Sequence, residues 1–178
     1  MTRRQPLRRP TESRRGAGAG YGFAVPVYLV RHAHAGSRSS WNGSDTSRPL
    51  SPKGRHQAAG VLELVQGIAI DRIASSPATR CIETVQPIAK AVGLTVEPDV
   101  RLGEGATAAG CIDMMRASGD RSVVLCSHGD LIPKVIRRLR ADGLAGTDPN
   151  LSQKGSVWVI KVVDGEFASG SYHPPTRN

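Results

Sequence analysis

Short apolar runs alternate along the chain with segments in which apolar residues recur at the spacing of an α-helix. Runs rich in β-branched and aliphatic residues predict strands, and they lie at residues 25–30, 71–76, 94–98 and 122–128. Two more β-rich runs enclose Asp164-Gly165 near the C-terminus, a dipeptide that strongly indicates a hairpin. The chain therefore supplies strands for one sheet, the last pair joined by a tight turn.

Helical spacing fills the intervals between these strands. Ser51 predicts an N-cap, Pro52 the first helical position and Gly67 the end of the first helix. Further helices are predicted over residues 78–92, over residues 107–118 and from Pro133 onward. Pro87 is expected to kink the second of these helices.

Strands that alternate with helices predict an α/β fold, in which a mainly parallel sheet is covered on both faces. We expect a three-layer α/β/α sandwich over residues 25–178 that closes with the C-terminal β-hairpin. No internal repeat or long linker divides this part, which predicts a single domain. Ligands of such folds bind at the carboxyl ends of the strands. His32 and His128 each follow a predicted strand, so we expect both at that edge of the sheet.

The formal charge of +9 would suggest a nucleic-acid partner if it were spread over the domain. Residues 1–20, however, hold six arginines and one glutamate, and the rest of the chain is only mildly basic. This segment has almost no apolar residues, so residues 1–24 are predicted to form a disordered Arg-rich tail. Loose binding to nucleic acid and a misassigned start codon both stay open for the tail. Nucleic acid is not the partner we expect for the domain.

The three cysteines, Cys81, Cys111 and Cys126, are odd in number and show no Cys-x-x-Cys spacing. This pattern favours free, buried thiols in a reducing cytoplasm. No run of 18 apolar residues is present, and residues 1–24 lack the apolar core of a secretory signal. We therefore expect a cytoplasmic protein without a membrane partner.

The first apolar run ends at Arg31-His32, and a second histidine, His34, follows two residues later. Zinc needs three or four ligands, and no cysteine or carboxylate cluster completes a set nearby, so we expect no metal site. Arg48 and Arg80 lie beside a predicted helix start and strand end, where backbone N–H groups also favour anions. Guanidinium groups bind phosphate oxygens two at a time, and their field keeps a histidine neutral. These residues predict a phosphate pocket in which His32 attacks phosphorus.

Four segments carry these residues, namely "LVRHAHAG" (29–36), "SRPLSPKG" (47–54), "SSPATRCIETV" (75–85) and "CSHGD" (126–130). In order, spacing and context they resemble the histidine phosphatase superfamily. The combination of "RH", "SSPxxRxxxT" and "SHG" is specific, and the resemblance runs from about residue 25 to the C-terminal hairpin. It implies a phosphoglycerate mutase-like fold. The short chain and the "SRPLSPKG" segment are most similar to the small SixA-type phosphohistidine phosphatases.

By this resemblance His32 is the nucleophile that becomes phosphorylated, and Arg31, Arg48 and Arg80 bind the phosphoryl oxygens. His128 would complete the pocket and stabilise charge while the phosphoryl group moves. The resemblance implies two in-line transfers, from substrate to His32 and from His32 to water. It implies no metal and no other cofactor, because the arginines supply the electrostatic stabilisation that a magnesium ion supplies elsewhere.

Three positions need separate comment. Ala33 stands where the family usually has glycine. The methyl group of the alanine is expected to tighten the backbone at this position. Glu104 is the candidate general acid for the leaving group, although an ordinary loop glutamate stays the alternative. His34 takes a position at which relatives carry Glu, Asp or His, and it is expected in the pocket wall.

The resemblance implies a metal-independent phosphatase, with a phosphohistidine-bearing protein or a small phosphorylated metabolite as its partner. A nucleotide- or polyphosphate-directed enzyme and a small phosphomonoester phosphatase of the same superfamily are the alternatives within this class. A non-catalytic phosphate- or nucleic-acid-binding protein is the alternative outside it. The 43 residues between Thr84 and His128 leave no room for a lid or for the insertions of a mutase. We therefore expect an open site that favours large substrates and leaving groups that depart easily.

Overall fold

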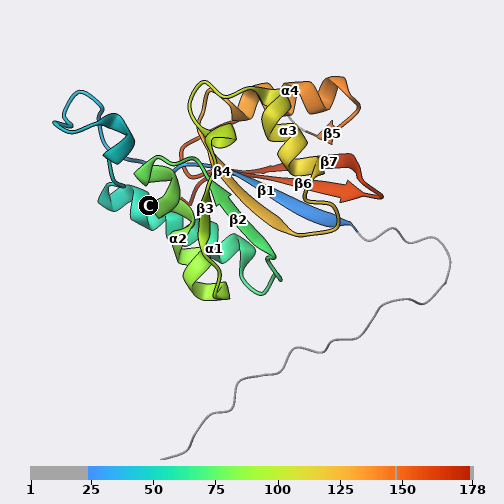
Figure 1. The fold of residues 1–178 in the computed structure, drawn as a ribbon, viewed down its shortest axis with the longest axis horizontal. Helices are drawn as coiled ribbons and strands as arrows, with labels where there is room; N and C mark the ends of the chain where they lie inside the picture. The colour runs from blue at the N-terminus through green and yellow to red at the C-terminus, as the bar shows by residue number, and fades with distance from the viewer. Residues whose placement is uncertain (1–23, 147, 177–178) are drawn as a thin grey trace, which may run out of the picture.

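The computed structural model describes residues 24–146 and 148–176. The predicted basic tail thus lies outside the described residues apart from Ala24, and the predicted domain boundaries stay a prediction. Within the described part, one sheet contains seven strands in the order β3-β2-β4-β1-β6-β7-β5 (Figure 1). The strands are β1 (Val25–Arg31), β2 (Arg72–Ser75), β3 (Val96–Pro98), β4 (Val123–Ser127), β5 (Ala145–Gly146), β6 (Val157–Val163) and β7 (Glu166–His173).

The sheet is mainly parallel, as predicted. β1 lies parallel to β4, β4 to β2 and β2 to β3, whereas β6 is antiparallel to both β1 and β7. The two-residue turn of the β6–β7 hairpin has φ 52° at Asp164 and φ 83° at Gly165. Such a turn needs left-handed backbone at both positions, which Asp-Gly tolerates. The predicted hairpin is therefore confirmed, and the sequence pattern missed only the two-residue strand β5.

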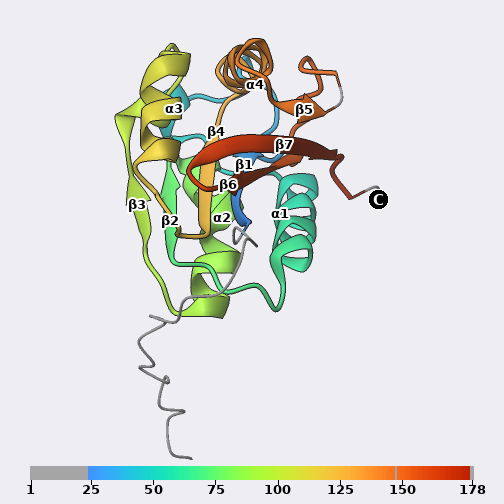
Figure 2. The same ribbon diagram turned by 90° about the vertical axis from the view of Figure 1, so that its right-hand side faces the viewer.

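In the described part of the chain, four α-helices pack against this sheet in two layers. Figure 2 shows α1 and α2 on one face and α3 and α4 on the other. Ser51 caps α1 as predicted, since its hydroxyl accepts a hydrogen bond from the N–H of Gly54. Pro87 lies inside α2, which continues beyond it to Val92. The helices are α1 (Pro52–Val65), α2 (Thr79–Val92), α3 (Ala108–Arg116) and α4 (Ile132–Ala141), with short 3-10 helices η1 (Asp45–Ser47) and η2 (Val100–Leu102).

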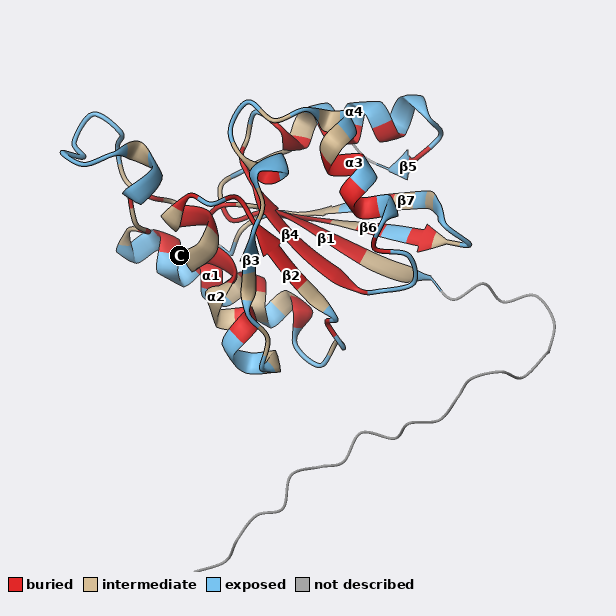
Figure 3. Cartoon of the chain, viewed as in Figure 1, coloured by how far each residue is buried: buried red, intermediate tan, exposed pale blue. Residues whose placement is uncertain are grey.

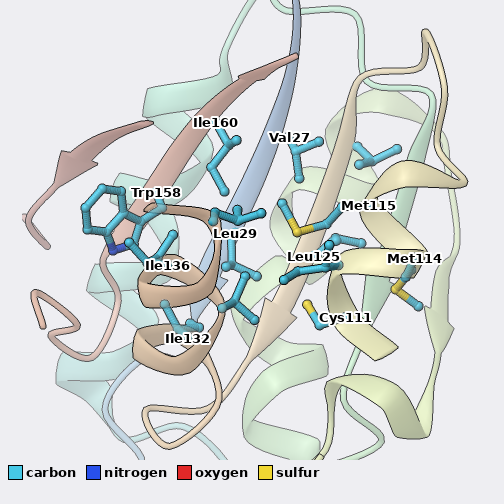
Figure 4. Packing of buried hydrophobic residues seen from close by; sticks show 14 of the residues in the cluster. Val27, Leu29, Cys111, Met114, Met115, Leu125, Ile132, Ile136, Trp158 and Ile160 are labelled. Carbon is cyan, nitrogen blue, oxygen red and sulfur yellow. The ribbon is translucent and has the colours of Figure 1, made fainter. Parts of the chain in front are cut away.

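The alternation of side chains along β1 divides the core into two halves. Val27 and Leu29 pack with α3 and α4, and Figure 4 shows them among the residues of that half. Tyr28 and Val30 face the opposite way, toward α1 and α2. The central strands are buried on both faces (Figure 3), as in other parallel sheets covered by helices. The three cysteines are free and buried, as expected.

The carboxyl ends of β1, β2 and β4 lie side by side, because these strands are adjacent and parallel. The segments that follow them begin at residues 32, 76 and 128, which places three predicted site motifs at one edge of the sheet. The loop that carries η1 projects on this side, at the left of Figure 1. No helix in the described ranges is long and apolar enough to cross a membrane.

Candidate active site

His32 follows β1 directly and is fixed through its backbone and its ring. Its N–H donates to the carbonyl of Ser127 at 2.9 Å, which ties it to the end of β4. Its Nδ1 lies 2.8 Å from the carbonyl oxygen of Ala33, which can only accept, so Nδ1 carries the proton. The lone pair on Nε2 is then free for chemistry. His32 is 6 % exposed and lines a cavity at the edge of the sheet.

The surroundings of His32 keep its ring neutral. Burial lowers the pKa of His32 to about 3, and the positive fields of Arg80 and Arg31 and the neighbouring His128 act in the same direction. The hydrogen bond to Ala33 opposes this shift without cancelling it. An imidazole attacks only with an unprotonated nitrogen, so this environment keeps His32 nucleophilic through the neutral and mildly acidic range.

His128 follows β4 and faces His32, with the ring centroids 5.2 Å apart in an edge-on arrangement. Its Nε2 lies 2.8 Å from the hydroxyl of Ser76 and its Nδ1 3.4 Å from Nη2 of Arg80. Arg80 comes from the first turn of α2 and is 1 % exposed. The structure thus brings together the two histidines and the arginine of the "SSPATR" motif.

Arg31 and Arg48 approach the cavity from other sides. The guanidinium of Arg31 donates to the carbonyl of Ser152 and lies against Gly129, where a Cβ atom would be 2.5 Å from its Cζ. This contact explains the glycine after His128, because any side chain there would displace the guanidinium. Arg48 donates from Nη1 to the carbonyl of Ala35 at 2.7 Å.

Two guanidinium N–H groups, Nε of Arg31 and Nε of Arg80, are buried without a hydrogen-bond partner in the described part of the chain. Buried donors without a partner are rare in folded proteins and cost free energy. A phosphoryl group has oxygens that could accept from both. The pair is therefore consistent with an anion site.

Asp45 is a central residue of the site that the sequence pattern did not single out. Its carboxylate accepts from Nε of Arg48 at 2.9 Å and pairs with Nη1 of Arg80 at 3.2 Å and Nη2 of Arg38 at 2.9 Å. Partial burial alone would raise the pKa of Asp45, but the hydrogen bonds from Arg38 and Arg48 lower it to about 2. Its position three residues before Arg48 is the only sequence signal that could have identified it.

Glu104 lies at the mouth of the site, as its predicted role requires. Its Oε1 is 3.0 Å from Nη2 of Arg80, 3.2 Å from Nη2 of Arg38 and 3.5 Å from Nδ1 of His128. About half of its side chain is exposed. Arg38 bridges Glu104 and Asp45, so the loop before η1 forms part of the rim. The expectation of an open site was drawn from the residues after Thr84 and did not consider this loop.

Two adjacent cavities share Glu104. One of ≈ 240 Å³ has His32, Arg31 and Arg48 in its lining. The other, ≈ 300 Å³, is lined by Arg80, His128 and several apolar residues, Pro77, Ala78 and Val100 among them. The first cavity has cations that could bind a phosphoryl group, and the second has space for the leaving group to which the phosphoryl group is attached. Arg38 and Lys154 also line the first cavity, although no motif marked them.

His34 is placed differently from the expectation. It does not line the cavity that contains His32. Its Nδ1 lies 2.7 Å from the hydroxyl of Ser51, and its carbonyl accepts from the N–H of Ser51. A Cβ on Gly54 would lie 1.9 Å from the same carbonyl, which explains the glycine in the first turn of α1. His34 therefore joins the β1 loop to α1, and its placement in the pocket wall was wrong.

No group of three or more His, Cys, Asp or Glu side chains within residues 24–146 and 148–176 is arranged to hold a metal ion. The cavity that contains His32 is lined by the cations Arg31, Arg38, Arg48 and Lys154, and Arg80 lines the adjacent cavity.

A protein-family model matches the part of the chain that contains most of these residues. The model of the histidine phosphatase superfamily, branch 1, matches residues 27–109. The match spans Arg31, His32, Arg48, Arg80 and Glu104, and it ends before His128.

Two curated proteins illustrate the similarity in sequence. The 8-oxo-(d)GTP phosphatase of Mycolicibacterium smegmatis is 29 % identical over 154 residues, which cover 84 % of this chain and 48 % of that protein. A Citrobacter koseri protein named "Probable phosphoglycerate mutase GpmB" is 36 % identical over 85 residues, which cover 45 % of this chain and 38 % of that protein. The chain thus matches about half or less of the length of these relatives.

Solved structures show the same fold. The protein histidine phosphatase SixA in complex with tungstate superposes with a TM-score of 0.69 at 20 % identity, over 85 % of this chain and 96 % of that one. The predicted phosphoglycerate mutase-like α/β/α architecture is confirmed by this likeness.

Proposed function

We propose that the chain is a phosphatase of the histidine phosphatase superfamily, whose branch 1 model matches residues 27–109, and that it transfers a phosphoryl group first to Nε2 of His32 and then to water. One observation carries the proposal. A histidine whose Nδ1 carries the proton, and whose pKa is lowered to about 3, lines a cavity with arginines around it. A neutral imidazole beside guanidinium groups suits attack on a phosphoryl group, which brings negative charge.

In the first step the lone pair of Nε2 attacks phosphorus and forms a P–N bond. The bond from phosphorus to the leaving group breaks, and its electron pair departs with the leaving group. Arg31, Arg48 and Arg80 would bind the phosphoryl oxygens, and His128 would stabilise the charge on the side of Arg80. Positioning and charge stabilisation are the main contributions a protein can make to phosphoryl transfer.

Glu104 would act as the general acid in the first step and as the general base in the second. It would protonate the leaving group as the first bond breaks, and its carboxylate would accept a proton from the attacking water in the second step. That water forms a new P–O bond while the P–N bond breaks, and the electron pair returns to Nε2. The contact of Glu104 with Arg80 and His128 supports this role, because it lies beside the groups that would hold phosphorus.

Phosphoryl groups with good leaving groups fit this site best. The first candidate substrate is a phosphohistidine on another protein, as for SixA-type enzymes, since half of the Glu104 side chain is exposed and a projecting imidazole could reach the cavity. Such a substrate and the three free, buried thiols agree with action in the cytoplasm.

The second candidate is a phosphoanhydride of a nucleotide or polyphosphate. The observation that favours it is the additional cation Lys154 in the cavity lining. A small phosphomonoester is less suited, because its alkoxide leaving group depends more strongly on an acid that is well protonated at neutral pH.

Hydrolysis assays in EDTA test the proposal. The wild type, His32→Gln and His56→Gln are compared on a phosphohistidine-bearing protein, phenyl phosphate and 3-phosphoglycerate. His56 is an exposed histidine of α1 and serves as the matched control. We expect activity in the wild type and in His56→Gln, none in His32→Gln, and kcat/KM lower on 3-phosphoglycerate by about 10²-fold, roughly 2.7 kcal/mol. Turnover by His32→Gln, or activity that EDTA removes and zinc or magnesium restores, would reject this mechanism.

A further inference from the structure

Lys154 lies next to the candidate nucleophile and is held there by the backbone. The N–H of the following residue, Gly155, donates to the carbonyls of Arg31 at 3.1 Å and His32 at 3.2 Å. Ser152 and Ser156 of the same segment accept hydrogen bonds from the side chain and the backbone N–H of Arg31. The segment before β6 therefore wraps around Arg31 and places the side chain of Lys154 in the wall of the His32 cavity.

In the part of the chain that the structure describes, the charge on Lys154 has no carboxylate partner, in contrast to the charges of Arg48 and Arg80. Arg48 pairs with Asp45, and Arg80 pairs with Asp45 and Glu104. Within the described residues, no carboxylate forms an ion pair with Lys154. Burial, together with the positive charges of Arg31, Arg48 and Arg80, lowers the pKa of Lys154. A half-buried ammonium among three guanidinium groups is stabilised when an anion binds between them.

We propose that Lys154 binds a second phosphate group of the substrate, adjacent to the transferred one, so that the preferred substrates are diphosphates such as nucleoside diphosphates. This inference rests on the proposed function of His32 and selects between its two candidate substrates. The defining juxtaposition is that of Lys154 and His32 in one cation-lined cavity.

The geometry of the reaction puts a second phosphate near the rim of this cavity. His32 lines this cavity and is only 6 % exposed, whereas the Arg38 side chain in the same lining is 65 % exposed. In-line attack by His32 places the leaving group on the far side of phosphorus, toward solvent. In a diphosphate this leaving group begins with the second phosphate, which would therefore lie among the residues of the rim.

The cavity has a volume of ≈ 240 Å³, and the exposed Arg38 in its lining shows that it opens to solvent, so a second phosphate can extend outward from the transferred one. A phosphohistidine would bring an uncharged imidazole to the rim and would leave Lys154 without an anionic partner.

Binding of two stable phosphonates tests the inference without turnover. Methylenediphosphonate presents two adjacent anionic groups and methylphosphonate presents one, and their affinities are measured by titration calorimetry. The ratio of the two affinities is compared in the wild type, Lys154→Gln, Lys154→Arg and Lys53→Gln. Lys53 is the matched control. It is an exposed lysine of α1 whose positive charge, like that of Lys154, lowers the pKa of His34, but it does not line the cavity.

We expect the wild type and Lys53→Gln to bind methylenediphosphonate at least about tenfold more tightly than methylphosphonate, a difference typical of one charge-assisted hydrogen bond. Lys154→Gln should lose this preference while its affinity for methylphosphonate stays within about threefold, and Lys154→Arg should keep it. Melting curves verify that each variant is folded.

Two results would overturn the inference. An equal fold-loss of both affinities in Lys154→Gln would place Lys154 on the transferred phosphate, and affinities for both phosphonates equal to those of the wild type would give it no part in binding. Neither result depends on hydrolysis. A chain that shows the Lys154-dependent preference but hydrolyses no phosphate would keep the diphosphate site and reject the proposed function.

Discussion

Asp45 joins three arginines, and its carboxylate sets the orientation of two that we place on the phosphoryl group. It contacts Arg48 at 2.9 Å and Arg80 at 3.2 Å, and the backbone carbonyl of Asp45 also accepts from Arg80 at 2.7 Å. A neutral amide would offer one acceptor in place of the two carboxylate oxygens. The orientation of the guanidinium groups should therefore depend on the charge of Asp45.

Asp45→Asn should lower kcat/KM by roughly 10- to 100-fold, because each misplaced guanidinium removes a charge-assisted hydrogen bond worth about 1.5 to 3 kcal/mol. The affinity for inorganic phosphate should fall by a similar factor. Asp113→Asn, at an exposed position of α3, is the control and should leave both values unchanged. An Asp45→Asn variant that binds phosphate normally would show that the arginines hold their positions without it.

The lowered pKa of His32 predicts a pH dependence of stability. The unfolded chain takes up a proton on this residue near pH 6.5, whereas the folded protein does so only near its pKa of about 3. The stability that depends on neutral His32 is thus fully present above pH 6.5 and declines as the pH falls toward 3. The slope is at most about 1.4 kcal/mol per pH unit, so roughly 2 kcal/mol should be lost between pH 6.5 and 4.5.

Denaturant unfolding of the wild type, His32→Gln and His56→Gln across this range measures the effect. The wild type and His56→Gln should lose stability more steeply than His32→Gln. Parallel stability curves for all three proteins would contradict the assignment of a neutral, buried His32.

At the scale of elements, the connection from β4 to α4 controls the position of Arg31. Gly129 follows His128 in this connection, and a Cβ there would lie 2.5 Å from Cζ of Arg31. Gly129→Ala should therefore displace the guanidinium and weaken phosphate binding by about tenfold, with the larger effect on KM than on kcat.

Gly110→Ala is the matched control, because the Cβ in α3 would meet the Thr107 hydroxyl at 3.3 Å and no group of the cavity. Phosphate binding by Gly110→Ala should equal that of the wild type. If Gly129→Ala also bound phosphate normally, Arg31 would have no part in holding it.

The sequence predicted the helices and strands more completely than it predicted the residues of the site. An apolar run predicts a buried strand and a 3.6-residue period predicts a helix, and both signals are local. The pattern therefore predicted β1, α1 and the Asp164-Gly165 hairpin close to their observed bounds. The short strand β5 carries too few residues for such a pattern, since it spans only Ala145–Gly146.

At the scale of the whole molecule, the site combines residues that no local pattern relates. The order of strands brought the motifs of Arg31, Arg80 and His128 to one edge, and the rule for parallel sheets was enough to expect this. Asp45 and Lys154 could not be found in this way. Asp45 pairs with the arginines from η1 and Lys154 lines the cavity from the segment before β6, and the course of both segments depends on long-range contacts. The misplacement of His34 has the same origin, since its partner Ser51 lies 17 positions further along the chain.

The central claim is that a phosphoryl group is carried on His32. Enzyme mixed with a ³²P-labelled substrate and quenched in alkali should retain the label on the protein, because a P–N bond survives base and breaks in acid. Mass spectrometry of the peptide that contains residues 29–36 should place it on His32. His56→Gln should be labelled like the wild type, and His32→Gln should carry no label. Label that survives acid, or that persists in His32→Gln, would contradict the account.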